Sequence, residues 1–246
     1  MKKQFQPKQA AWLREIRDAL GMLVDPEYRE GIGRIVPTTN NILGVRVPAI
    51  RGLVKEFAAR HDDLDLGAAC EFMDAAAAER GREEMLFATF LLARFRRWFV
   101  KAEELEEMWR HIDAWVEAVD NWETCDQLAT NVASPVVAAQ IDRVRDLVEW
   151  AGSGNAWRRR FAVVTTAGLN QKGRRFPAET LRVCEALMND PDAMVQKAVG
   201  WALREATEAD EGLAAAFLLR WKGKGAPRIM REGSEKLSRE NRELLR

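Results

Sequence analysis

Apolar residues recur every three to four positions along most of the chain, which is the spacing of one face of an α-helix. Proline and glycine fall mostly between these periodic segments, and runs typical of strands are short. We therefore predict an all-α protein. The pattern places helices, with ends uncertain by several residues, over 8–23, 47–60, 66–79, 82–99, 102–118, 122–133, 135–150, 155–169, 177–189, 192–206, 208–220 and 227–244, the last open to division into two short helices.

The segment 25–46 interrupts this pattern. It holds two prolines and three glycines, and we predict an irregular connection there. From residue 81 onward the helices come in pairs of roughly 30–45 residues, a period typical of HEAT-like solenoids. One helix pair cannot bury its apolar face alone, so neighbouring pairs stack and form a concave surface. We predict a single HEAT-like repeat domain over 1–246, with an irregular N-terminal helix and connection over 1–46 and stacked helix pairs over 47–246.

Composition narrows the class of protein. Apolar residues make up 47% of the chain, enough for a sizeable core, and 38 basic residues balance 38 acidic ones. A net charge of zero argues mildly against nucleic acid unless the basic residues gather on one face. Three separate cysteines and two histidines predict no metal site. No apolar stretch of about 18 residues occurs, and none follows the basic N-terminus, so we expect a cytoplasmic protein without a membrane partner.

The first candidate for chemistry is the pair Trp122 and Asp126. Positions four apart lie on one face of a helix, one turn apart, so the indole projects beside the carboxylate. A structural interpretation competes with this one. An acidic residue in the first turn favours the helix dipole, and the tryptophan would then belong to the core. The spacing alone favours the structural interpretation.

The second candidate is a run of arginines that follows Trp157. Arg158 and Arg160 belong to this run, and Lys172 and Arg174 lie near the far end of the same predicted helix. Together they form a candidate phosphate-binding patch. The alternative is a solvated arginine face whose aliphatic stems cover apolar surface, which is common.

The third candidate is the helix around Trp201. Its apolar arc leaves the tryptophan at the margin, between Lys197 and Arg204. Gly200 costs about 1 kcal/mol of helix stability relative to alanine, so something is expected to approach closely there. A glycine that serves helix packing beside a half-buried tryptophan explains the same pattern.

At these three segments the chain resembles the AlkD family of DNA alkylation-repair glycosylases. Residues 122–126 resemble the family's Trp-Asp-Thr-Val-Asp motif, and residues 157–160 resemble its Trp-x-x-Arg element. Residues 196–205 nearly reproduce its Gln-Lys-Ala-Ile-Gly-Trp-x-Leu-Arg-Glu helix, the most specific match. Residues 42–51 are similar to its Gly-x-x-x-Pro-x-x-Arg element, so the resemblance covers roughly 42–245.

This chain departs from the family pattern at three places. Asn121 stands where the type member has an aromatic residue, and Glu123 and Cys125 replace Asp and Val. These departures bear on whether the activity is retained. The first alternative is therefore a catalytically inactive HEAT-repeat binder of branched or distorted DNA. The second, which the zero net charge favours, is a HEAT scaffold that binds another protein.

The resemblance implies a curved helical stack with a basic concave face, acting as a monomer on double-stranded DNA that contains alkylated bases. It implies hydrolysis of the glycosidic bond of N3- and N7-alkylated purines. By position, Trp122 and Trp201 would contact the deoxyribose, Asp126 would be the catalytic carboxylate, and Arg160 would hold a backbone phosphate. The other predicted DNA contacts are Trp157, Arg158, Lys172, Arg174, Lys197 and Arg204.

This chemistry suits a site with few functional groups. The alkylated purine is cationic and leaves as a neutral base, so the leaving group needs no general acid. Positive charge then develops on the sugar, where a carboxylate and tryptophan faces attract it, the latter by roughly 0.5–2 kcal/mol each. No metal ion or organic cofactor is expected.

Overall fold

The computed structural model describes residues 7–245, apart from the side chains of residues 7–9, 102 and 103, and its chain divides into two compact units, 1–132 and 133–246. The described residues form helices and turns, with one isolated β-bridge between Asn41 and Gly81 and no strand. The prediction of an all-α protein is therefore confirmed. Among the described helices, none combines the length and apolar character needed to cross a membrane.

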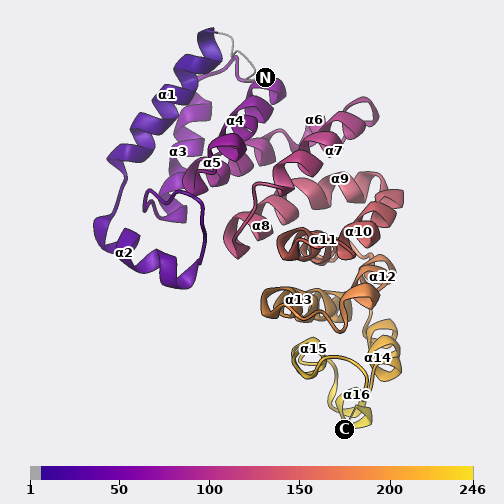
Figure 1. Ribbon diagram of the computed structural model, residues 1–246. Coiled ribbons are helices and arrows are strands. Elements are labelled where there is room, and N and C mark those ends of the chain that lie inside the picture. Colours follow the sequence, from indigo (N-terminus) through magenta and orange to yellow (C-terminus); the bar gives the residue numbers. More distant parts are fainter. Residues whose placement is uncertain (1–6, 246) are drawn as a thin grey trace. The chain divides into compact units, whose positions relative to one another are not determined.

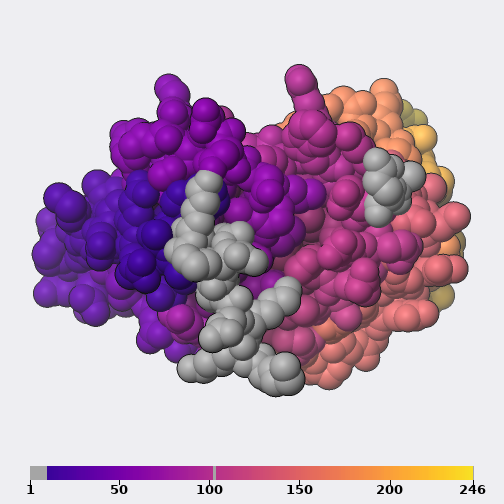
Figure 2. Space-filling model, turned by 90° about the horizontal axis from the view of Figure 1, so that it is seen from above, coloured from indigo at the N-terminus to yellow at the C-terminus, as the bar shows by residue number. Residues whose placement is uncertain are grey.

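Unit 1 is built around α5 (Figure 1), which packs against α3, α4 and α8. α4 also contacts α1 and α7, and Figure 2 shows the indigo surface of α1 lying against the purple surface of its neighbours. The helices of unit 1 are α1 (Pro7–Met22), α2 (Pro26–Ile35), α3 (Val47–Arg60), α4 (Leu66–Glu79), α5 (Arg82–Arg94), α6 (Arg96–Phe99), α7 (Ala102–Val116) and α8 (Trp122–Leu128).

Aromatic rings form the centre of the unit 1 core. The ring of Phe57, fully buried on α3, lies edge-on to Trp12 of α1 at 6.3 Å, to Phe72 of α4 at 6.0 Å and to Phe87 of α5 at 5.7 Å between centroids. Such edge-to-face pairs add to the stabilisation from burial. The cluster joins four helices, and one of them, α5, is the helix against which α8 packs.

Unit 2 consists of two rows of helices. In one row α9, α11, α13 and α15 each contact the next, and in the other α10, α12 and α14 do the same. This arrangement is a helical repeat; the finer assignment to HEAT-type repeats and to one domain stays a prediction. A π-helical turn (Ala129–Ala133) leads into α9 (Ser134–Ala139), a 3₁₀ turn (Ile141–Arg143), α10 (Val144–Ala151), α11 (Ala156–Gly168), α12 (Pro177–Leu187), α13 (Ala193–Ala209), α14 (Glu211–Arg220), α15 (Pro227–Gly233) and α16 (Arg239–Leu244).

Two glycines let α13 and α15 approach each other closely. A Cβ atom on Gly200 would lie 2.7 Å from the Cβ of Glu232, and one on Gly233 would lie 2.6 Å from Cδ1 of Leu203. Real Cβ atoms do not come this close to other carbon atoms, so a larger residue at either position would force Glu232 or Leu203 to shift. The approach predicted at Gly200 is thus explained by helix packing.

The prediction of an irregular connection over 25–46 is wrong for its first half, where α2 forms. Asp25 caps this helix by accepting a hydrogen bond from the backbone N–H of Tyr28 at 2.9 Å, and Pro26 occupies the first turn. An acidic cap followed by proline is a strong start signal, and it outweighs the two glycines inside the helix. Two longer predicted helices are also divided, 82–99 near Phe95 and 135–150 at Gln140.

Candidate functional site

The start of α8 is held by the side chain before the tryptophan. Oδ1 of Asn121 accepts hydrogen bonds from the backbone N–H groups of Glu123 at 3.1 Å and Thr124 at 3.0 Å. These N–H groups have no partner inside the helix, and asparagine is among the residues that satisfy them best. Asn121, one of the three departures from the family pattern, is therefore a helix cap, and it fixes where α8 begins.

Asp120 ties the same point to the loop after α2. Its carboxylate accepts hydrogen bonds from the hydroxyl group of Thr38, from the backbone N–H and hydroxyl of Thr39 at 2.6 and 2.7 Å, and from the backbone N–H of Asn40 at 3.1 Å. Burial raises the pKa of Asp120, but the hydrogen bonds from Thr38, Thr39 and Asn121 outweigh it, and the net pKa lies below the ordinary value.

Trp122 is half-buried at the first position of α8. Its indole Nε1 donates to the backbone carbonyl of Ile35 at 2.9 Å, and Ile35 ends α2 with a side chain that is 65% exposed. The helix that the sequence did not predict thus fixes the orientation of the candidate sugar-contacting tryptophan.

A buried ionic cluster lies behind this tryptophan. The side chain of Arg82 is fully buried and donates to the carboxylates of Glu83 at 2.7 Å and Glu123 at 2.8 Å, and also to the hydroxyl of Tyr28 at 3.2 Å. Burial lowers the pKa of Arg82, but the carboxylates of Glu123 and Glu83 raise it by more than burial lowers it. The net pKa of Arg82 therefore lies above the ordinary value. Arginine therefore stays charged and joins the starts of α5 and α8 to α2.

Glu83 extends this cluster to the loop before α3. Its carboxylate accepts hydrogen bonds from the backbone N–H groups of Leu43 at 2.9 Å, Gly44 at 2.9 Å and Val45 at 3.2 Å. Gly44 has a φ of +94°, and a Cβ atom there would lie 2.4 Å from the Cβ of Arg29 on α2. The loop that resembles the family's early element is therefore shaped around a carboxylate.

Asp126 lies one turn after Trp122 on α8, and its side chain is half-buried. The π-helical turn begins three residues later, and the hydroxyl of Thr130 donates to the backbone carbonyl of Asp126 at 2.7 Å. π-helical turns inside helices occur frequently at functional sites. Next to Asp126, Oε1 of Gln127 accepts hydrogen bonds from Arg51 and from Asn131, each at 3.1 Å.

In unit 2, the three consecutive arginines at the start of α11 have different surroundings. Arg159 binds both carboxylate oxygens of buried Asp190, at 2.6 and 3.1 Å, and the carbonyl of Ser153 at 3.0 Å. The hydrogen bonds to Asp190 raise the pKa of Arg159. Arg158 lies over the ring of Trp150, 4.5 Å from the centroid, and Arg160 is only 4% exposed and donates to the carbonyl of Met194.

The burial of Arg160 bears on its predicted phosphate contact. Its guanidinium joins α11 to the first turn of α13, so part of its hydrogen-bonding capacity is used inside unit 2. The phosphate role stays a prediction. Trp157 is half-buried at the start of α11, where Asn155 accepts a hydrogen bond from its backbone N–H at 2.9 Å.

On α13, Trp201 is half-buried and its Nε1 donates to the carboxylate of Glu205 at 2.8 Å. Lys197, one turn earlier, is exposed. Arg204 is half-buried and contacts the carbonyl of Glu232 and the carboxylate of Glu235, each at 3.2 Å. Lys197 therefore remains open to an anion, whereas Arg204 also braces α13 against the α15 region.

The two cations after α11 also differ. Lys172 is exposed, in a left-handed backbone conformation with a φ of 55°. Arg174 is half-buried and donates to the carbonyl of Gly168, the last residue of α11. A cation at this end of a helix satisfies carbonyl groups that have no partner inside it. Arg174 therefore stabilises α11 whether or not it contacts DNA.

The candidate residues form two sets. Trp122 and Asp126 are brought together by α8 in unit 1, while the bond from Arg160 to the start of α13 links α11 to the helix of Trp201 in unit 2. The predicted convergence of all four joins residues of different units and stays a prediction. Sequence reasoning missed Arg82, and the start signal at Asp25 was the one available indication that α2 supports the site.

The two sets differ in their electrostatic background. Residues 1–132 contain 18 Lys and Arg against 23 Asp and Glu, and residues 133–246 contain 20 against 15, so the formal net charges are −5 and +5. The zero net charge of the whole chain conceals this difference. Within the described residues, no three His, Cys, Asp or Glu side chains are grouped so that they could hold a metal ion.

Comparison with known proteins shows what the sequence and the fold are similar to. The family model described as DNA alkylation repair enzyme matches residues 16–237, and no curated protein matches the chain. A predicted DNA alkylation repair enzyme from Enterococcus faecalis shares the fold with a TM-score of 0.64 at 18% identity, over 88% of this chain and 97% of that one. AlkD2 from Streptococcus mutans gives a TM-score of 0.59 at 19% identity, over 94% and 99%. The smu.31 protein of the same species gives 0.53 at 22%, over 78% and 99%.

Proposed function

Because the chain belongs to the DNA alkylation repair enzyme family, we propose that it is a DNA glycosylase for cationic N3- and N7-alkylated purines in duplex DNA. Water replaces the purine at C1′ of the deoxyribose, and the base leaves as a neutral molecule. The reaction needs stabilisation of positive charge on the sugar rather than protonation of the base. Aspartate and tryptophan supply such stabilisation without a cofactor.

The observation that carries the proposal is the geometry of α8. Trp122 and Asp126 lie on successive turns of one short helix, and both are half-buried rather than enclosed in the core. This helix is fixed in place by the Asn121 cap and the Arg82 cluster, and its tryptophan is fixed by the carbonyl of Ile35. A carboxylate held in advance of the reaction stabilises developing charge without a reorganisation cost.

Binding of the DNA backbone is assigned to unit 2. Its net charge of +5 attracts phosphates, and Lys172 and Lys197 are exposed on it. Neutralising phosphates with such cations releases counterions, so affinity falls steeply with salt. Trp201 is the second candidate for contact with the deoxyribose, from α13.

The direct test is base release. Purified protein is incubated with duplex DNA methylated at purines, and released 3-methyladenine and 7-methylguanine are measured against the spontaneous rate. Asp126→Asn keeps the size of the side chain and removes its charge, so we expect release to fall on the order of 100-fold with DNA affinity nearly unchanged. Asp62→Asn, at an exposed position after α3, is the matched control and should leave release unchanged.

The other outcomes separate the alternatives. DNA binding without release above the spontaneous rate would favour a non-catalytic binder, and tighter binding to branched than to linear duplex would identify its substrate. Absence of salt-dependent DNA binding would favour a scaffold for another protein. Release that is equal in the wild type and in Asp126→Asn would refute the role of this carboxylate while leaving the activity in place.

A further inference from the structure

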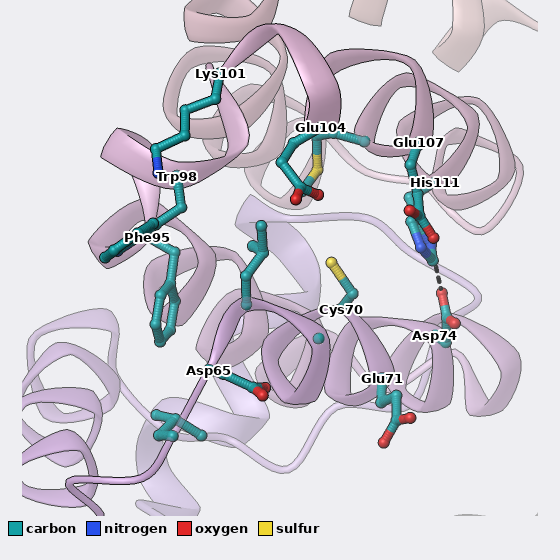
Figure 3. Close-up of a pocket in the computed structure, with 14 residues that line it drawn as sticks. Asp65, Cys70, Glu71, Asp74, Phe95, Trp98, Lys101, Glu104, Glu107 and His111 are labelled. Atoms are coloured by element: carbon teal, nitrogen blue, oxygen red, sulfur yellow. Dashed lines mark hydrogen bonds and ion pairs between the residues drawn. The ribbon is translucent and has the colours of Figure 1, made fainter.

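Unit 1 contains a pocket outside the candidate site, and no residue of α8 lines it. It lies between the first half of α4 and the segment formed by α6 and α7 (Figure 3), and its volume is about 600 Å³. Sites for small molecules typically have volumes of about 300–1,000 Å³ and mostly apolar walls. The apolar lining consists of Leu64, Leu66, Cys70, Phe95, Trp98 and Met108.

The polar lining is dominated by carboxylates, with Asp65, Glu71, Asp74, Glu104 and Glu107 against a single lysine and a single histidine. Two of these carboxylates have structural duties. Asp65 caps α4 through the backbone N–H of Ala68 at 2.8 Å, and Asp74 accepts from the indole of Trp115 at 2.8 Å.

The carboxylates of α7 are directed toward the pocket itself, whereas that of Glu71 points to the other side of α4. Glu104 extends from α7 into the space above Cys70 in Figure 3. Glu107, three residues later on α7, lies beside His111 in the same view. Two carboxylates on the same wall of a pocket attract a cation.

The aromatic wall already interacts with a cation from the chain. Nζ of Lys101 lies 4.1 Å from the centroid of the Trp98 ring, and this indole is 55% exposed. Large apolar side chains with that much exposure are uncommon in this structure, and an indole face attracts cations through its quadrupole. The pocket therefore combines an apolar surface, an aromatic face and negative charge.

We propose that this pocket binds a small organic cation with an apolar body, of the class of aromatic or alkyl amines. The ammonium group lies beside Glu104 and Glu107, and the body packs against Phe95 and Trp98. A bare metal ion does not fit, because the described carboxylates are not grouped as metal ligands are. The site carries no role in the glycosylase reaction proposed above and stands independently of it.

The probe is tryptamine, compared with tryptophol and indole-3-acetate, which share the indole and differ in charge. Binding to the full-length protein is measured by calorimetry or ligand-observed NMR at low salt. We expect tryptamine to bind at least about tenfold more tightly than neutral tryptophol, and indole-3-acetate to bind weakest. Equal affinities for tryptamine and tryptophol would overturn the proposal, because charge would then play no part.

Variants locate the site. Glu104→Gln is expected to weaken tryptamine binding several-fold while leaving tryptophol unaffected, and Trp98→Ala is expected to weaken both. Glu56→Gln, exposed on α3 and outside the pocket, is the matched control and should change neither. Thermal unfolding of each variant verifies that it is folded. Unchanged tryptamine affinity in the Glu104→Gln and Trp98→Ala variants would refute this pocket. Binding of lysine-rich peptides without binding of tryptamine would refute the proposed class of ligand.

Discussion

Arg82 of unit 1 and Arg159 of unit 2 are both held by carboxylates, yet they belong to different electrostatic designs. Arg82 is enclosed completely, between two glutamates and a tyrosine hydroxyl, in a unit with a net charge of −5. Arg159 holds one buried aspartate in a unit with a net charge of +5, where lysines such as Lys197 stay exposed. Both arginines serve internal structure and both units expose cations, so the units differ in their net charge, in which acidic residues outnumber basic ones only in unit 1.

This difference shows how a chain of zero net charge can serve a polyanionic substrate. Electrostatic attraction to DNA depends on where cations gather rather than on their sum. Under the proposed function, the basic unit supplies attraction to phosphates and the acidic unit supplies the carboxylate that faces a cationic sugar. Each of the following experiments tests one side of this comparison.

The largest effect is expected at the buried cluster of unit 1. Arg82→Ala leaves Glu83 and Glu123 buried without their cation, and breaking a buried pair in this way costs about 3–5 kcal/mol of unfolding free energy. Urea unfolding measures the loss. Arg60→Ala is the control, since its pair with Glu15 is exposed and should contribute under about 1 kcal/mol. Equal losses in the two variants would show that the cluster does not hold unit 1 together.

The next effect is expected at the close approach in unit 2. Gly200→Ala places a methyl group against the Cβ of Glu232, and we expect a loss of about 1–3 kcal/mol despite the better helix propensity of alanine. Gly31→Ala, in α2 of unit 1, meets no atom within 4 Å and should instead stabilise its helix by up to about 1 kcal/mol. Thermal unfolding of both variants measures the contrast, and a stabilising Gly200→Ala would remove the packing explanation.

Periodicity predicted much of the fold correctly because it reflects local burial. The predicted helices 47–60 and 66–79 coincide with α3 and α4, whose buried residues follow the helical repeat. α2 was not predicted because the prolines and glycines of 25–46 indicated an irregular connection, although Asp25 followed by Pro26 is also a helix start signal. A cap is a local signal too, so this error was avoidable.

The candidate site could be predicted only in part. Residues one turn apart, such as Trp122 and Asp126, share a face by helix geometry alone. The pairing of Arg82 with Glu123, however, joins positions 41 residues apart and leaves no periodic trace. Among three consecutive arginines, the sequence also could not indicate that Arg159 and Arg160 bind partners within unit 2. Partners distant in sequence are decided by packing, which spacing does not encode.

The basic side of the comparison is tested by salt dependence. Lys197→Ala removes one exposed cation from unit 2, so we expect DNA affinity to fall a few-fold and the slope of log affinity against log salt to decrease by about 1. Fluorescence anisotropy with duplex DNA at several salt concentrations measures both quantities. Lys55→Ala, exposed on α3 of unit 1, is the matched control. A similar change in slope for Lys55→Ala would show that cations of both units contact phosphates.

The smallest effect concerns the acidic side and depends on pH. The pKa of Asp120 is lowered in the folded protein by hydrogen bonds from Thr38, Thr39 and Asn121 that outweigh burial. Such a carboxyl stabilises the fold above its ordinary pKa and loses that contribution as pH falls through the folded value. Asp120→Asn should therefore lower stability at pH 7, by under about 1 kcal/mol because water screens the site, and the difference from wild type should shrink below about pH 4. Urea titrations across pH measure this difference, and Asp18→Asn, exposed on α1, is the control that should show no such convergence. A loss of stability in Asp120→Asn that does not change with pH would assign its effect to hydrogen-bond geometry rather than to charge.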